Sequence, residues 1–130
     1  MMKKLFALLA LGMFSVFANA ASPHIADISQ TELKAVVASK SAVLLDVNGS
    51  DSYKDGHIPG AIDFLAHQQD IAKLLPADKG ALIVAYCANE HCPAYQMGAE
   101  AAIALGYTNV KHFAPGILGW RKSGAPTEKG

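Results

Sequence analysis

Short apolar runs alternate with stretches of helical periodicity along most of this chain. The runs Ala42–Val47 and Ala81–Tyr86 are almost continuously apolar, which is typical of strands buried on both faces of a sheet. Shorter strands are predicted at Ala61–Leu65 and Thr108–Phe113. Because helical stretches separate these strands, the pattern predicts an α/β domain, with a parallel sheet and helices on both of its faces.

The first helix is expected directly after Ser29. Ser29 followed by Glu32 is a capping-box signature, and Leu33, Val36 and Val37 give the segment one apolar face. The sequence also predicts one helical turn at 52–54, a helix over 67–75 that Pro76 stops, and a last helix over 117–122.

The longest of the remaining helices is expected to begin at Pro93, a residue well suited to the first helical position. Its apolar residues are spaced by three, four and four positions, which predicts that one face packs on the core. That face consists of Ala94, Met97, Ala101 and Leu105. Gly106 then supplies the C-terminal cap.

The first twenty residues have the features of a secretory signal peptide. A basic start precedes an apolar stretch over 5–17, and Ala18 and Ala20 are small residues at the positions that a signal peptidase reads. We therefore expect an exported, periplasmic protein without membrane attachment after cleavage; a retained N-terminal anchor helix is the alternative. The predicted segments are a signal peptide at 1–20, a flexible lead at 21–27 and one domain at 28–126.

The charge balance and the spacing of the histidines argue against nucleic acid, membrane surfaces and metal ions as partners. The chain has 11 basic and 11 acidic residues, so nothing in its charge favours nucleic acid or a membrane surface. His24, His67 and His112 are scattered without the spacing of metal ligands. We expect a monomer that binds small molecules, with neither a metal nor a cofactor. His57 is expected to fix the turn between Gly56 and Gly60.

The candidate chemistry lies in the loop between Tyr86 and Pro93. Cys87 is expected where backbone N–H groups and a helix N-terminus converge, which favours anions and lowers a thiol pKa, so Cys87 is a candidate nucleophile. An oxidising compartment tends to pair nearby thiols, but a Cys87–Cys92 disulfide would close too small a loop to stabilise the fold much. Cys92 is therefore either a resolving thiol for Cys87 or a protective or inert neighbour.

Asp46 ends the strand Ala42–Val47, and Cys87 follows the strand Ala81–Tyr86. Since ligands collect at the carboxyl ends of parallel strands, both residues are expected at the functional edge of the sheet. For Asp46, a supporting role as an acceptor of backbone hydrogen bonds is favoured over direct catalysis.

Three separated motifs resemble those of the rhodanese superfamily. They are Leu44–Val47 with the turn Gly56–Ile62, the loop that follows Ala85–Cys87, and Pro115–Ile117 with Trp120. The resemblance implies a three-layer rhodanese-like domain and sulfur transfer. In that chemistry the thiolate of Cys87 takes a sulfane sulfur from a small donor, becomes a persulfide, and passes the sulfur to cyanide or a thiol. The substrate-binding loop would be Ala88, Asn89, Glu90, His91 and Cys92.

The loop also departs from the family pattern. Glu90, His91 and Cys92 stand where glycine or basic residues are common, which favours a persulfide or thiol over thiosulfate as the donor. Pro93 occupies the position where phosphatases of this fold need an arginine, so phosphatase chemistry is excluded. Two alternatives to sulfurtransferase remain open. One is a thiol–disulfide redox protein that uses Cys87 with Cys92, and the other is a non-catalytic binding module.

Overall fold

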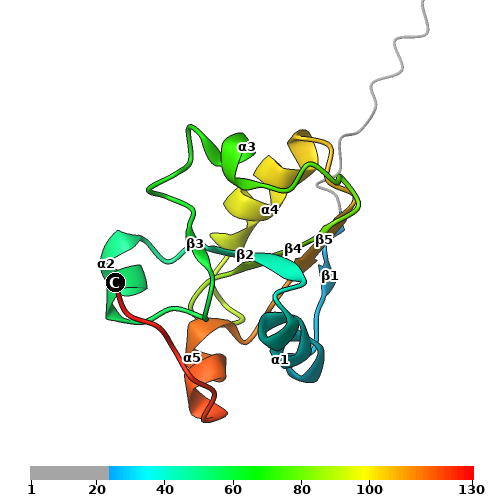
Figure 1. Ribbon diagram of the computed structural model, residues 1–130. Coiled ribbons are helices and arrows are strands. Elements are labelled where there is room, and N and C mark those ends of the chain that lie inside the picture. The colour runs from blue at the N-terminus through cyan, green and yellow to red at the C-terminus, as the bar shows by residue number, and fades with distance from the viewer. Residues whose placement is uncertain (1–23) are drawn as a thin grey trace, which may run out of the picture.

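Five parallel strands form the central sheet of the computed structural model, which describes residues 24–130. The strand order is β1-β5-β4-β2-β3, so β4 lies in the middle of the sheet (Figure 1). The bounds are β1 (Ala26–Asp27), β2 (Ala42–Asp46), β3 (Ile62–Asp63), β4 (Leu82–Tyr86) and β5 (Asn109–His112). The expected signal peptide and the first part of the expected lead lie outside the described residues.

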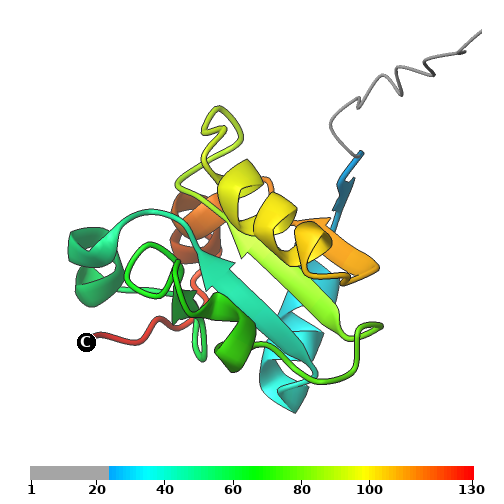
Figure 2. The ribbon, with the colours of Figure 1, turned by 90° about the horizontal axis from the view of Figure 1, so that it is seen from above.

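Helices cover both faces of this sheet, as the sequence predicts. They are α1 (Gln30–Ser39), α2 (Ser50–Asp55), α3 (Ile71–Leu74), α4 (Tyr95–Ala104) and α5 (Gly116–Lys122). Figure 1 shows α3 and α4 above the sheet and α1 and α5 below it, and Figure 2 shows α4 over the sheet, running in about the same direction as the strands. The fold is therefore a three-layer α/β sandwich. Over residues 24–130, none of the helices has the length and apolar character needed to cross a membrane.

Two apolar clusters, one on each face, hold the layers together. The cluster under α1 and α5 includes Leu33, Leu44 and Trp120. The cluster under α3 and α4 includes Leu45 and Ala102. Neighbouring residues of a strand point to opposite faces, so the unbroken apolar runs supply both clusters at once.

The start of α1 confirms the predicted cap. The side chain of Ser29 accepts a hydrogen bond from the N–H of Glu32 at 3.2 Å, and Leu33 is fully buried. An unpredicted strand, β1, precedes this helix inside the segment expected to be a flexible lead. It pairs in parallel with β5, with Ala26 opposite Lys111, and so adds a fifth strand to the sheet edge.

The prediction for 61–75 was wrong in extent. The helix expected over 67–75 is only α3, and the strand expected over 61–65 is only β3. Asp63 explains the early end of β3, because its carboxylate accepts the N–H of Ala66 at 3.3 Å and turns the chain away. A second turn follows, in which the N–H of Asp70 bonds to the carbonyl of His67.

The predicted apolar face of α4 was also partly wrong. Met97 is 45% exposed, whereas Gly98, Ala99 and Ala102 are buried. At Gly98 an added Cβ would lie 3.1 Å from a methyl carbon of Val47, so α4 approaches the sheet through its smallest residues. The spacing of apolar residues predicted that Met97 would face the core. Because the helix packs closely on the sheet, small residues occupy the contact face instead.

Candidate active site

Cys87 lies at the carboxyl end of β4, in the middle of the sheet, and its exposed fraction is 0%. The start of α5 fixes the backbone at this point. The N–H of Ile117 donates to the carbonyl of Cys87 at 2.9 Å, and the N–H of Leu118 donates to the carbonyl of Ala88 at 3.0 Å. The first turn of α5 therefore holds the chain just where it leaves the strand.

This contact depends on glycine at position 116. Gly116 has a φ of +63°, in the left-handed region, and a Cβ there would lie 2.5 Å from the carbonyl oxygen of Cys87. The same Cβ would lie 2.5 Å from the carbonyl carbon of Ala88. No side chain fits in that gap, so the close approach of α5 to the loop requires Gly116.

Asn89 organises the loop that follows Cys87. Its side-chain oxygen accepts the N–H of His91 at 3.0 Å, and its carbonyl accepts the N–H of Cys92 at 3.2 Å. Within residues 24–130, the N–H groups of residues 88–90 donate to no acceptor. Of the five residues predicted to bind substrate, these three therefore have backbone N–H groups without a partner, while the N–H groups of His91 and Cys92 are occupied.

The side chains of Glu90 and His91 in this loop are largely exposed to solvent. The side chain of Glu90 is 65% exposed and that of His91 is 86% exposed, with a distance of 3.8 Å between His91 Nε2 and Glu90 Oε1. Water screens the Glu90 carboxylate at this exposure, so it presents a weak barrier to an anion that approaches Cys87.

The structure brings the two cysteines together as a disulfide. The Cα atoms of Cys87 and Cys92 are 6.0 Å apart, within the usual range for such a bond. Cys87 is completely buried, whereas Cys92 is only partly buried. The sequence left this pairing open, and the structure shows that the loop conformation permits it. In this state Cys87 has no thiolate, so its nucleophilic form requires reduction of the disulfide.

Asp46, at the end of β2, lies beside the end of β4 and is buried. Its carboxylate accepts the N–H of Asn48 at 2.8 Å and the hydroxyl of Tyr86 at 2.8 Å. The Tyr86 hydroxyl in turn accepts the N–H of Ile58 at 3.1 Å. Asp46 therefore ties β2, β4 and the turn around Ile58 together, and one of its hydrogen bonds comes from a backbone N–H as expected. The part played by Tyr86 was missed, because its partners are distant in sequence.

Burial raises the pKa of the Asp46 carboxyl above its ordinary value, and the hydrogen bonds from Asn48 and Tyr86 only partly oppose this. Burial also raises the pKa of Tyr86, and the neighbouring Asp46 adds to the effect, so the phenol stays protonated as a donor. The folded protein thus holds a proton on Asp46 more tightly than the unfolded chain does. This group's contribution to stability is largest at acid pH and falls as the pH rises through the raised pKa.

We expect Tyr86→Phe to lower the free energy of unfolding by about 1–3 kcal/mol at pH 7. The variant leaves the N–H of Ile58 without its hydrogen-bond partner, and it leaves the buried Asp46 carboxylate with the N–H of Asn48 but without the Tyr86 hydroxyl. Loss of a donor should raise the pKa of Asp46 further, so the difference from wild type should shrink as the pH is lowered. Urea unfolding at a series of pH values measures this.

Tyr107→Phe is the matched control. Tyr107 is another buried tyrosine, but its hydroxyl donates to the backbone carbonyl of Pro76 rather than to a carboxylate. Its loss of stability should not change with pH. A pH-independent loss for Tyr86→Phe as well would show that Asp46 is not coupled to this hydroxyl.

The turn that contains His57 also behaves as predicted. His57 is buried, its Nδ1 lies 2.8 Å from the carbonyl oxygen of Tyr53, and the two rings stack with centroids 3.7 Å apart. Its backbone pairs with Glu128, whose carboxylate also accepts the N–H of Gly60 at 3.2 Å. These contacts hold the turn from both sides, so His57 is a structural residue.

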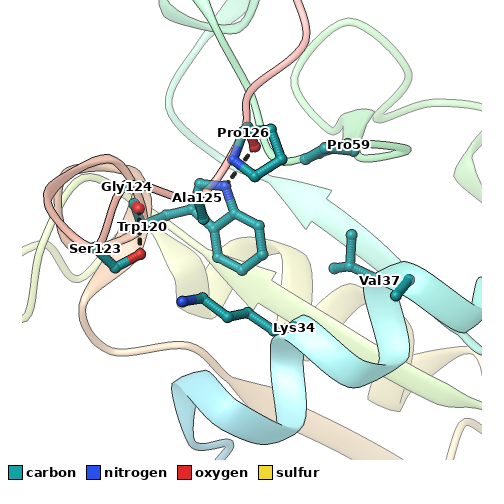
Figure 3. Close-up of a pocket in the computed structure, with 9 residues that line it drawn as sticks. Lys34, Val37, Pro59, Trp120, Ser123, Gly124, Ala125 and Pro126 are labelled. Carbon is teal, nitrogen blue, oxygen red and sulfur yellow. Dashed lines mark hydrogen bonds between the residues drawn. The ribbon is translucent and has the colours of Figure 1, made fainter.

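Two of the cavities in the described part of the chain lie beside α5 and beside the loop after Cys87. One of about 500 Å³ opens between α1 and α5, with Trp120 at its base and Lys34 and Val37 on one wall (Figure 3). A second, of about 520 Å³, is lined by Glu90 and His112 among others. Neither cavity is lined by Cys87 or Cys92. Over residues 24–130, no three His, Cys, Asp or Glu side chains form a group that could hold a metal ion.

A comparison with models of protein families identifies the family of this chain. Residues 29–123 match the model of the rhodanese-like domain. The chain belongs to the rhodanese-like domain family. The match contains Asp46, the cysteine loop and the start of α5, and it confirms the resemblance carried by the three sequence motifs.

A curated relative and two solved structures illustrate the range of this family. The rhodanese-like chain is 34% identical over 104 residues to an HTH-type transcriptional regulator of Mycobacterium tuberculosis, covering 79% of this chain but 45% of that protein. It therefore spans less than half the length of that relative.

The solved structures agree on the fold. A thiosulfate sulfurtransferase from Pseudomonas aeruginosa has a TM-score of 0.61 and 24% identity, covering 82% of this chain and 21% of that one. A human single-domain sulfurtransferase has a TM-score of 0.59 and 23% identity, covering 76% and 97% of the two chains. At these identities the comparison shows the shared fold alone.

Proposed function

We propose that this rhodanese-like domain is a sulfurtransferase in which Cys87 carries the transferred sulfur as a persulfide. The observation that carries the proposal is the position of Cys87 at the end of the central strand, followed directly by the unoccupied N–H groups of residues 88–90. Such donors stabilise a thiolate and the additional anionic sulfur of a persulfide without a metal ion. The two structural relatives named as sulfurtransferases support the same class of reaction.

The reaction is a pair of displacements at sulfur. The Cys87 thiolate attacks the sulfane sulfur of a small donor, whose S–S bond breaks, and the rest of the donor leaves with the bonding electron pair. With thiosulfate the leaving group is sulfite, and with a persulfide it is a thiolate. In the second displacement, cyanide or a thiolate attacks the outer sulfur and releases the Cys87 thiolate.

Reduction of the disulfide precedes this cycle. Because Cys92 is the more exposed partner, an incoming thiolate reaches its sulfur first, and Cys87 departs as the leaving group. The N–H groups of residues 88–90 favour that step, since they stabilise the departing thiolate. Reduction therefore frees the Cys87 thiolate, which is the group that then takes the sulfane sulfur from the donor.

A thiol–disulfide redox protein is the second candidate function, and the observed Cys87–Cys92 bond is what favours it. That function requires a reversible disulfide of defined potential and predicts that neither cysteine holds a sulfur atom after exposure to a donor. A non-catalytic binding module predicts in addition an unreactive Cys87.

The proposed setting is an exported, oxidising compartment, where a monomer meets small sulfur-containing anions, thiols or persulfides. The signal-like N-terminal sequence supports export, and the disulfide suits an oxidising environment. Fractionation of cells that express the full chain, with mass measurement of its N-terminus, tests both export and cleavage after Ala20.

Intact-mass spectrometry of the reduced domain tests the sulfurtransferase proposal. After exposure to thiosulfate or a small organic persulfide, Cys92→Ser should gain one sulfur atom, because Cys87 becomes a persulfide with no neighbouring thiol. Cyanide or a thiol should then remove that sulfur. Cys87→Ser should gain none. Failure of Cys92→Ser to gain sulfur from either donor would reject the proposal, in favour of the redox protein or the binding module.

A further inference from the structure

We propose that Cys92 is the internal thiol that resolves the Cys87 persulfide, so that the domain releases the carried sulfur as hydrosulfide and closes the Cys87–Cys92 disulfide. This inference rests on the proposed persulfide at Cys87 and adds the fate of its outer sulfur. The observed disulfide is the product that such a step leaves behind.

The loop holds Cys92 next to Cys87 by more than the bond between them. The carbonyl oxygen of Cys92 lies 3.6 Å from the sulfur of Cys87, and the N–H of Cys92 bonds to the carbonyl of Asn89. On the other side, α5 holds the carbonyls of Cys87 and Ala88. The hydrogen bonds made by Asn89 and α5 are backbone contacts that do not involve the disulfide sulfur atoms, so they continue to hold the two ends of the loop when the bond is reduced.

This proximity gives Cys92 an advantage over acceptors in solution. An attack within one short loop avoids the loss of translational freedom that an external thiol must undergo, which corresponds to a high effective concentration. Cys87 is also completely buried at the carboxyl end of β4, and Cys92 is the thiol adjacent to it. The thiol nearest to a persulfide at Cys87 is thus part of the same loop.

The step balances in atoms and electrons. The thiol of Cys92 loses its proton and its sulfur attacks the Cys87 sulfur, forming the disulfide bond. The S–S bond of the persulfide breaks, and the outer sulfur leaves with the bonding electron pair and the proton as hydrosulfide. The sulfane sulfur is reduced by two electrons, and the two cysteines are oxidised by two.

A dithiol reductant, either a small molecule or a protein, completes the cycle. Its first thiolate attacks the more exposed Cys92 and frees Cys87, and its second thiolate resolves the mixed disulfide. With thiosulfate as donor, one turnover converts thiosulfate and a dithiol into sulfite, hydrosulfide and a disulfide. A purely structural bond explains the pair poorly, because so small a loop contributes little to stability.

Single turnover without reductant tests this inference. The domain is reduced, freed of reductant under anaerobic conditions and mixed with one equivalent of thiosulfate or of an organic persulfide. Wild type should release sulfide in step with donor consumption and lose two hydrogens in intact mass. Cys92→Ser should retain the sulfur and release at least about tenfold less sulfide, because it lacks the internal thiol that displaces hydrosulfide. Cys87→Ser should do neither, and wild type without donor sets the background.

The outcomes separate the two proposals. Sulfur retained by wild type as it is by Cys92→Ser, with no sulfide released, would overturn the resolving role of Cys92 and leave the persulfide proposal standing. Equal sulfide release from wild type and Cys92→Ser would overturn it as well. A Cys92→Ser variant that takes up no sulfur would instead reject the persulfide itself.

Discussion

Gly116→Ala is expected to lower the free energy of unfolding by about 2–5 kcal/mol. About 1–2 kcal/mol of this comes from placing an L residue at the left-handed φ of +63°. Overpacking adds about 1–3 kcal/mol, because the new methyl group would meet the backbone of Cys87 and Ala88 at about 2.5 Å. The backbone atoms of Cys87 and Ala88 move less easily than a flexible side chain, so the loop itself must shift to make room.

The shift should also reduce activity. The variant loosens the hydrogen bonds from Ile117 and Leu118 to the carbonyls of Cys87 and Ala88, which set where the loop begins. Sulfur loading of Cys87, measured by intact mass in a Cys92→Ser background, should therefore slow relative to the same background with Gly116 intact. Urea unfolding gives the stability change.

Gly124→Ala is the control that isolates the clash. Gly124 also has a left-handed φ, +79°, but an added Cβ would meet nothing within 4 Å. It should lose only the conformational part, about 1–2 kcal/mol, and load sulfur normally. Equal losses for the two variants would mean that α5 moves away without cost, and the proposed hold on the loop would be wrong.

Gly116 also illustrates what the sequence could and could not reveal. Its motif was recognised, but the reason for glycine there is contact with backbone atoms of Cys87 and Ala88, far away along the chain. The sequence around Gly116 contains no information about how closely the start of α5 approaches that backbone. The position of Cys87, by contrast, was predictable. An apolar strand followed by a loop and a helix places the first loop residue at the carboxyl end of a parallel strand, where ligands collect in such sheets.

The same division holds for the fold. The buried strands β2 and β4 were predicted closely, because a strand covered on both faces needs an unbroken apolar run. The contact face of α4 was not, because Gly98 is selected by its closeness to Val47 rather than by hydrophobicity. The disulfide stayed open at the sequence level because the loop conformation, organised by Asn89, decides whether the two cysteines meet.

Helix α5, which holds the loop after Cys87, depends in turn on Trp120. We expect Trp120→Ala to lower the free energy of unfolding by about 3–5 kcal/mol, since it removes a large buried side chain. The indole packs edge-on against Phe113, with ring centroids 6.3 Å apart, and its N–H donates to the carbonyl of Pro126 at 2.7 Å. Its loss enlarges the cavity between α1 and α5 and frees the segment after α5 (Figure 3). Urea unfolding measures the change.

Leu118→Ala tests whether this effect belongs to burial rather than to helix α5 as a whole. Leu118 lies two residues earlier on the same helix and is 51% exposed, so its truncation should change stability by no more than about 0.5 kcal/mol. The backbone N–H of Leu118 still reaches the carbonyl of Ala88 in that variant, and sulfur loading should be unchanged. If the two variants were equally stable, α5 would not be anchored through Trp120, and the loop would have to be held by the first turn of α5 alone.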